Sequence, residues 1–385
     1  MTTTSLTPSA ASLHTPAPRP MEIGARPIGT DGRRPRVLVL YTGGTIGMRP
    51  SPRGYRPDPG FLEAQLTDLA NLQAPSFPEI TILSHDPLLD SADMTPIDWM
   101  RIADDLRAQH DRYDGFVVLH GTDTLAYTAS ALSFVFDRLA KPIVLTGSQI
   151  PIGEVRNDAR DNLINSLLIA SRMRPVPEVC ICFGGQLLRG NRASKTSAVR
   201  LRAFHSPNHP PLGSLGVDLR LDHDRIMAPS PDPLRFLPIG RDDGDGAVHM
   251  PRVATLQLSP GLSLDVIERF LDAPLEGAVL HTYGAGNAPA SARLTRVLER
   301  AVARGVVLVN CTQCEEGTVQ MDRYATGRAL LDAGVVSGYD MTPEAAITKL
   351  MWVLSRPIDT RQARREMQAN LRGELSRPRA SAPAY

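Results

Sequence analysis

The chain has 385 residues, of which 42% are hydrophobic and 22% are charged, and its formal net charge is +1. This composition is typical of a soluble globular protein, and the length predicts roughly two domains. No basic run interleaved with aromatic residues suggests a nucleic-acid partner, and no apolar run reaches the roughly 18 residues that would suggest a membrane span. The first 20 residues do not resemble a secretory signal, so we expect a cytoplasmic protein.

Four cysteines do not make a disulfide framework, which agrees with a reducing compartment. Cys311 and Cys314 form one C-x-x-C motif. A zinc site would need a second pair of ligands, and a redox pair would need a thioredoxin-like setting; the sequence offers neither. We expect no metal site and no cofactor.

Residues 1–34 carry few large apolar groups and are expected to be a disordered extension. The apolar run 37–41 then predicts a strand buried on both faces. It ends at Gly43 and Gly44, which permit unusual backbone angles and a close approach of a ligand to the main chain. Thr45 follows this turn and is the candidate nucleophile. The alternative is that Thr45 only caps the turn that follows.

Proline and glycine interrupt the next segment, 49–60, which we interpret as a loop and a candidate lid containing Tyr55. A helix is expected over 61–72 and a short strand over 79–83. The Thr95–Pro96 pair predicts the start of a helix that runs to about residue 110.

Further apolar strands are predicted at 115–119, 141–147 and 178–183, with a helix at 162–172. Polar residues follow these strands, which indicates an open parallel or mixed sheet with helices on both faces and a ligand crevice along one edge. The polar segment 189–195, which contains Lys195, is expected to leave the sheet. We place this larger domain at 35–224.

The segment 225–250 is dense in proline, aspartate and glycine and is the predicted interdomain linker. Strands and helices alternate again in 251–375, which predicts a smaller C-terminal α/β domain. Residues 376–385 are expected to form a tail.

Three polar groups need a common explanation: Thr45 in the glycine turn, Thr122 and Asp123 in the turn after the strand 115–119, and Lys195. A threonine hydroxyl is a poor nucleophile until a base activates it, and a lysine beside an aspartate can assist. Together these groups make acyl transfer plausible. Taken alone, Thr122 could be a turn residue, Asp123 a helix cap and Lys195 a surface lysine.

At these positions the sequence resembles the L-asparaginases, specifically the bacterial cytoplasmic type I group. The resemblance rests on motifs that occur in that family's order and cover residues 36–375: YTGGTIGM, LLDSADMTP, HGTDTLAYTASALSF, GSQIP, RGNRASK, YGAGNAP, NCTQC and NLRGEL.

The resemblance implies that Thr45 attacks the side-chain amide of L-asparagine and that Tyr55 helps to activate it when the lid closes. Thr122, Asp123 and Lys195 would form a second triad. Asp123 would also bind the substrate's α-ammonium, and backbone N–H groups near Thr122 would stabilise the oxyanion. The α-carboxylate end of the substrate would lie at Ser91 with the flanking Asp90 and Ala92.

Some type I enzymes bind a second asparagine near an arginine and near the cysteine of TQC. Here Cys314 matches, but His281 stands at the arginine position and is expected to bind a carboxylate less well. The family also builds sites between subunits, which implies a homodimer or homotetramer with Asn287 facing a neighbouring site.

Three other functions compete with L-asparaginase. The first is a related amidase that prefers glutamine, or the amidase component of a tRNA-dependent amidotransferase, which would carry an extra folded N-terminal domain. The second is a non-catalytic asparagine sensor, which would have no use for the nucleophiles. The third, nucleotide binding, is disfavoured because TGGTIG lacks the glycine spacing and the lysine of phosphate-binding loops.

Overall fold

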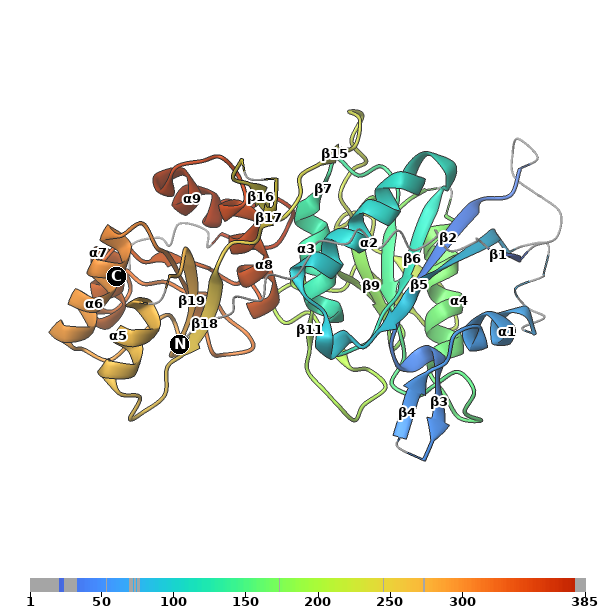
Figure 1. Cartoon of the computed structure of the whole chain (residues 1–385), viewed down its shortest axis with the longest axis horizontal. Coiled ribbons are helices and arrows are strands. Elements are labelled where there is room, and N and C mark those ends of the chain that lie inside the picture. The colour runs from blue at the N-terminus through green and yellow to red at the C-terminus, as the bar shows by residue number, and fades with distance from the viewer. Residues whose placement is uncertain are drawn as a thin grey trace, which may run out of the picture.

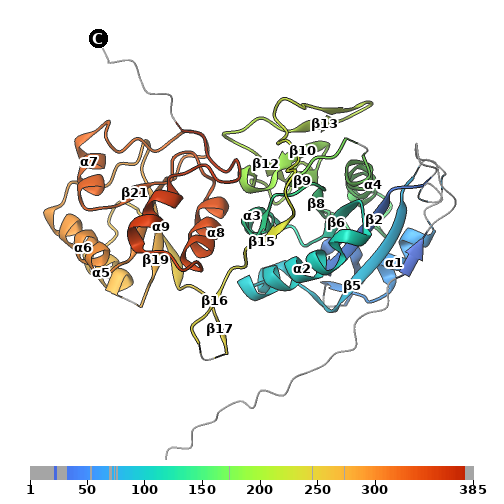
Figure 2. The same ribbon diagram turned by 90° about the horizontal axis from the view of Figure 1, so that it is seen from above.

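The structure, a computed structural model, describes residues 21–23, 33–52, 54–68, 72, 74, 77–172, 174–244, 246–272 and 274–377. A large N-terminal sheet domain is followed by a smaller C-terminal α/β domain (Figures 1 and 2), which confirms the predicted fold class. Residues 1–20, 24–32 and 378–385 of the predicted extension and tail lie outside the described residues. Met21–Ile23, within that predicted extension, form a strand.

The N-terminal part contains, in chain order, β1 (Met21–Ile23), β2 (Arg36–Gly43), β3 (Met48–Ser51), β4 (Gly54–Pro57), α1 (Phe61–Thr67), β5 (Glu79–Leu89), α2 (Pro96–Gln109), β6 (Gly115–Leu119), α3 (Leu125–Val135), β7 (Phe136–Asp137), β8 (Ile143–Thr146), α4 (Ala159–Ala170), β9 (Val179–Phe183), β10 (Gln186–Arg189), β11 (Ser194–Lys195), β12 (Phe204–His205), β13 (Gly213–Leu215) and β14 (Leu219–Leu221).

The predicted linker contains β15 (Arg235–Phe236), β16 (Arg241–Asp242) and β17 (Val248–His249), and the C-terminal part contains β18 (Val253–Gln257), α5 (Leu264–Asp272), β19 (Gly277–Thr282), α6 (Ala292–Ala303), β20 (Val307–Thr312), α7 (Ala325–Asp332), β21 (Val336–Ser337), α8 (Pro343–Leu354) and α9 (Thr360–Met367). In the linker, β15 pairs with β7 and β16 pairs with β17.

The large sheet has the strand order β1-β5-β2-β6-β8-β9-β10-β13-β14 among the described residues. Neighbouring strands from β5 to β9 are parallel, and the outer strands β1, β10, β13 and β14 are antiparallel to their neighbours. The expected strand 79–83 continues to residue 89, because β5 rejoins β2 at Leu89 and Gly43 after a register shift. The carboxyl ends of β5, β2, β6 and β8 therefore share one edge.

Strand β2 shows how this sheet is covered on both faces. Leu38 and Leu40 pack in one core with α2 and α3, whereas Val37, Val39 and Tyr41 pack in a second core with α1 and α4. Alternate side chains of a strand point to opposite faces, so a continuous apolar run requires helices on both sides.

The C-terminal domain has a parallel sheet of order β18-β19-β20-β21. Helices α5, α6 and α7 contribute to a separate core. Helices α8 and α9 join the core that contains α3, and α8 packs against α3 between the two domains (Figures 1 and 2). The two domains thus share apolar packing.

The polar segment 189–195 was expected to leave the sheet, but part of it is buried between the two domains. Asn191 and Arg192 are buried, and Arg192 forms an ion pair with Asp340 at 3.1 Å and donates to the carbonyl of Glu374 at 2.9 Å. These contacts come from the C-terminal part of the chain. The segment is a buried joint between domains rather than an exposed excursion.

Candidate active site

The predicted site residues gather at the edge where β5, β2, β6 and β8 end. Thr42, at the end of β2, is buried and its hydroxyl donates to the carbonyl of Leu119 at 2.9 Å, which ties β2 to β6. Thr45 begins a single 3₁₀ turn after Gly44 and is partly exposed. Of Thr42 and Thr45, only Thr45 can be reached by solvent and a substrate.

Glycines allow three of these turns to touch. Gly44 has a φ of 91°, and a Cβ there would fall 2.4 Å from Cα and N of Gly121. A Cβ on Gly121 would in turn fall 2.4 Å from Oγ of Ser91. Side chains at either glycine would push the turns apart. The two glycines thus bring the turn of Thr45 against the turn of Thr122, with Ser91 directly beneath.

Lys195 joins this group from β11, more than 70 residues along the chain. Its Nζ donates to Thr122 Oγ1 at 2.8 Å and to Asp123 Oδ1 at 2.6 Å. The lysine side chain is 18% exposed and that of Asp123 is 64% exposed. The structure therefore brings together the three residues that the sequence could only suggest as partners.

Gln149 also belongs to the site but was not singled out from the sequence. Its Oε1 accepts the hydroxyl of Thr122 at 3.3 Å, so Thr122 is oriented between Gln149 and Lys195. Asp158 holds this loop by accepting from the backbone N–H groups of Gln149 and Ile150. The available signal was the position of Gln149 in the loop that follows the buried strand β8 at the same sheet edge.

The segment predicted to bind the α-carboxylate end of the substrate adjoins these turns. Ser91 is buried, whereas Asp90 and Ala92 are exposed. Asp90 Oδ1 accepts from the backbone N–H of Ala92 at 3.0 Å, and the carbonyl of Ser91 accepts the hydroxyl of Thr124 at 2.6 Å. These contacts fix the turn next to Thr122 and Asp123.

His120 lies under the site and is fully buried. Burial lowers its pKa to about 4, so the ring is neutral near pH 7. Nδ1 lies 2.7 Å from the carbonyl of Gly121 and Nε2 lies 2.8 Å from the hydroxyl of Thr128. With Nδ1 as donor and Nε2 as acceptor, the neutral ring satisfies both neighbours and supports the turn that contains Thr122.

Tyr55 occupies the β3–β4 hairpin and is 51% exposed. Its hydroxyl donates to Glu154 Oε1 at 2.8 Å, and this contact raises the pKa of the phenol. The hairpin lies against the 3₁₀ turn that begins at Thr45. The predicted action of Tyr55 on Thr45 stays a prediction, because the hydroxyl here is engaged by Glu154.

Comparison with known protein families shows which family the chain belongs to. Residues 36–227 match the family described as asparaginase, N-terminal, and residues 252–367 match the glutaminase/asparaginase C-terminal domain. The chain belongs to the asparaginase family. The resemblance predicted from the motifs is thereby confirmed.

Three relatives illustrate how much of this asparaginase chain is shared. L-asparaginase 1 of Escherichia coli (strain K12) is 46% identical over 88% of the chain and 98% of the relative. The structure of L-asparaginase I from Vibrio cholerae covers 89% of the chain and 99% of that protein, with a TM-score of 0.81 and 43% identity. The thermostable L-asparaginase from Thermococcus kodakarensis covers 89% and 100%, with a TM-score of 0.78 and 35% identity.

Other features bear on the predicted second binding site and assembly of this asparaginase. A cavity of about 400 Å³ lies between the domains, and its lining includes Lys195, His281 and Cys314. His281 is half-buried, and burial lowers its pKa.

Asn287 lies in the C-terminal domain, where its Oδ1 accepts the hydroxyl of Thr326 at 2.9 Å. The weakened second binding site at His281 and the intersubunit role of Asn287 stay predictions.

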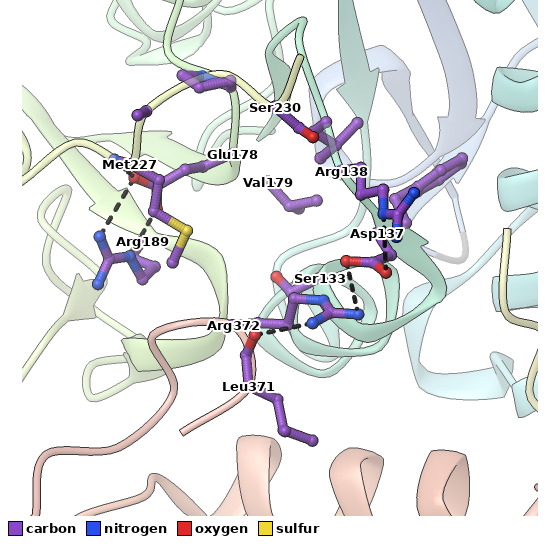
Figure 3. Close-up of a pocket in the computed structure, with 14 residues that line it drawn as sticks. Ser133, Asp137, Arg138, Glu178, Val179, Arg189, Met227, Ser230, Leu371 and Arg372 are labelled. Atoms are coloured by element: carbon purple, nitrogen blue, oxygen red, sulfur yellow. Dashed lines mark hydrogen bonds and ion pairs between the residues drawn. The ribbon is translucent and has the colours of Figure 1, made fainter. Parts of the chain in front are cut away.

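A second cavity of about 160 Å³ lies where the C-terminal segment meets the large domain (Figure 3). Its charged lining forms ion pairs within itself: Arg189 with Glu178 at 2.5 Å, and Arg372 with Asp137 at 2.9 Å. Figure 3 shows the Arg372 guanidinium directed at Asp137. These ion pairs hold chain segments together, so this cavity is not the candidate active site.

Among the described residues, no helix is long and apolar enough to cross a membrane.

Proposed function

We propose that this chain is an L-asparaginase that hydrolyses L-asparagine to L-aspartate and ammonia through a threonine acyl-enzyme. The observation that carries the proposal is the pair of hydrogen bonds from Lys195 Nζ to Thr122 Oγ1 and Asp123 Oδ1. The contact between Gly44 and Gly121 adds Thr45 to the same edge of the sheet. Membership of the asparaginase family supports the substrate class.

Thr45 attacks the side-chain amide carbon, and the tetrahedral intermediate collapses with loss of ammonia, which leaves an ester on Thr45. Water then attacks the ester and releases aspartate. Backbone N–H groups near Thr122 stabilise the oxyanion in both steps. Lys195 tunes the hydroxyl of Thr122, whose second contact is Gln149, and Tyr55 assists Thr45 when the hairpin moves.

Asp123 and the turn 90–92 fix the α-amino acid part of the substrate. Asp123 is exposed and carries a negative charge that suits an α-ammonium group, while Ser91 lies against Gly121. Neither contact measures the length of the side chain. Asparagine and glutamine differ by one methylene, worth about 1 to 3 kcal/mol in a pocket, so the preference between them is decided by assay.

Ammonia release by the purified protein tests the proposal, with L-asparagine and L-glutamine titrated from micromolar to millimolar concentrations. We expect strong turnover of asparagine and little of glutamine. Turnover that favours glutamine would indicate a glutaminase-preferring amidase. Binding of asparagine by folded protein without ammonia release would indicate a sensor and would overturn the proposal.

We further propose that the protein acts in the cytoplasm as a homodimer or homotetramer, with Asn287 facing a neighbouring active site. Family membership supports this assembly. Light scattering of the purified protein distinguishes the two forms, and a monomer that is fully active would contradict the intersubunit role of Asn287.

A further inference from the structure

Glu344 is a buried carboxylate at the start of α8 that the mechanism above does not use. Its residue exposure is 8%, and it belongs to the C-terminal domain. Its Oε2 accepts the hydroxyl of Ser194 at 2.7 Å, from the N-terminal domain, 150 positions earlier in the chain. Thr342 and the backbone N–H of Glu344 also hydrogen-bond this carboxyl group, so the contact with Ser194 is the one of the three that reaches the other domain.

Ser194 is the residue directly before Lys195, and together they make up β11. This strand has two residues and pairs only briefly with β12, Ser194 opposite His205 and Lys195 opposite Phe204. The backbone on either side is held by Thr196 N–H, which donates to the carbonyl of Ala203, and by the buried Arg192. The hydrogen bond to Glu344 adds a contact with the C-terminal domain at the residue next to Lys195.

Glu344 also faces the segment that carries the partners of Lys195. Thr122 and Asp123 directly precede α3, and α3 packs against α8. Tyr127, in the first turn of α3, is partly buried on the side of the helix that meets α8. Tyr127, Ser194, Lys195 and Glu344 line the same cavity between the domains.

We propose that Glu344 is a positioning residue that holds Lys195 in line with Thr122 and Asp123 by anchoring Ser194 across the domain interface. The proposal rests on the catalytic role proposed for Lys195. It makes the docking of α8 on the large domain a condition for catalysis, because the lysine is placed by one domain and its anchor by the other.

A purely structural role for Glu344 is the competing explanation. An acidic residue in the first turn of a helix interacts favourably with the helix dipole, and this would stabilise α8 without affecting Lys195. The two explanations differ in what happens to Lys195 when the protein remains folded.

The first part of the test compares kcat and KM of Glu344→Ala, Ser194→Ala, the double variant and Glu344→Gln. We expect each alanine variant to lose at least about tenfold in kcat with little change in KM, since a 1 Å misplacement costs about a hundredfold. The double variant should lose no more than either single one, because both remove the same contact. Glu344→Gln keeps an acceptor for Ser194 and should retain most of the activity.

The second part of the test measures how fast Lys195 is chemically labelled, which does not depend on catalytic activity. The chain has three lysines, Lys141, Lys195 and Lys349, so acetylation by a small acetylating reagent can be followed at each one by mass spectrometry. Lys349 is fully buried, and Lys141, whose Nζ donates to two backbone carbonyls, serves as the reference. We expect Lys195 to react several-fold faster, relative to Lys141, in Glu344→Ala and Ser194→Ala than in the wild type or Glu344→Gln.

Met351→Ala is the control on the same helix, because Met351 lies two turns further along α8 and packs against the shared core. It should lower the Tm and leave both kcat and the labelling of Lys195 unchanged. The proposal is overturned if folded Glu344→Ala shows a lowered Tm but wild-type kcat and labelling, or if the losses of the single variants multiply. If the wild type itself releases no ammonia, the proposed function fails while the labelling still decides the role of Glu344.

Discussion

Lys349 and Lys195 are both held by carboxylates, but in very different surroundings. Lys349 and its partner Glu374 have fully buried side chains, and Nζ donates to the carboxylate and to the carbonyls of Met367 and Ala369. Lys195 is 18% exposed, and Asp123, its carboxylate partner, is 64% exposed. The other contact of Lys195 Nζ is a threonine hydroxyl rather than a carbonyl.

This difference fits a structural role for the Lys349–Glu374 pair and the chemical role that we propose for Lys195. All three donors of Lys349 Nζ have acceptors, and Glu374 also accepts from the backbone N–H groups of Leu371 and Arg372. Such a saturated pair fixes the C-terminal segment and has no capacity left for a substrate. Lys195 is open to solvent and aimed at a hydroxyl, so its charge can act on a reacting group.

The largest expected effect comes from breaking the buried pair. Lys349→Met leaves Glu374 as an unpaired buried carboxylate and should lower the free energy of unfolding by about 3 to 5 kcal/mol. Lys349 lies on α8 five residues after Glu344, so kcat per folded molecule should stay close to the wild-type value as long as α8 remains docked on the large domain. Denaturant unfolding and kcat at a temperature where the variant is folded measure the two quantities. A stable variant, or a folded one without activity, would show that the two lysines are not divided in this way.

For Thr45 and Lys195 we expect a large loss of activity with little loss of stability. Thr45→Ala and Lys195→Met should each lower kcat by at least about a hundredfold, which is the scale of losing a nucleophile or its activator. Their free energies of unfolding should change little, since neither removes a buried, saturated interaction. Steady-state ammonia release provides the measurement, and full activity in either purified variant would remove that residue from the mechanism.

The same parts of the molecule show how much of the candidate site could be predicted from the sequence. The apolar strand 37–41 and the glycines after it identified the site edge, because local pattern determines a buried strand and its turn. The burial of Arg192 was not predictable, because its partner Asp340 is distant in sequence and belongs to the other domain. Glu344 was missed for the same reason, because its contact with Ser194 joins the two domains, whereas Gln149 lies in a loop after a predicted strand and could have been considered.

A third expected effect is smaller and concerns pH. His120 has a pKa near 4 in the folded chain and about 6.5 when unfolded, so between these values the unfolded chain binds more protons. Stability should therefore fall as the pH is lowered, by about 1.5 kcal/mol from pH 6.5 to pH 5 for this group. His209, whose pKa is also lowered to about 4, adds to the fall in the wild type.

His120→Gln isolates the contribution of His120, because it removes that titration and leaves His209 in place. The free energy of unfolding, measured in denaturant at both pH values, should fall less in the variant than in the wild type. Equal falls would show that His120 binds the same number of protons in the folded and the unfolded chain, so that burial does not lower its pKa.

The smallest expected effect concerns His281, in the cavity between the domains. Its side chain lies where the carboxylate of a second asparagine is predicted to bind. His281 lines that cavity with Cys314 and Lys195, and burial lowers its pKa. A neutral imidazole attracts a carboxylate less than a guanidinium does. We therefore expect the dependence of rate on asparagine concentration to be hyperbolic, with a Hill coefficient close to one. His281→Arg supplies the fixed charge that the wild type lacks and serves as the comparison. A Hill coefficient well above one in the wild type would show that a neutral side chain at this position is sufficient for a second molecule of asparagine to bind and couple to the active site.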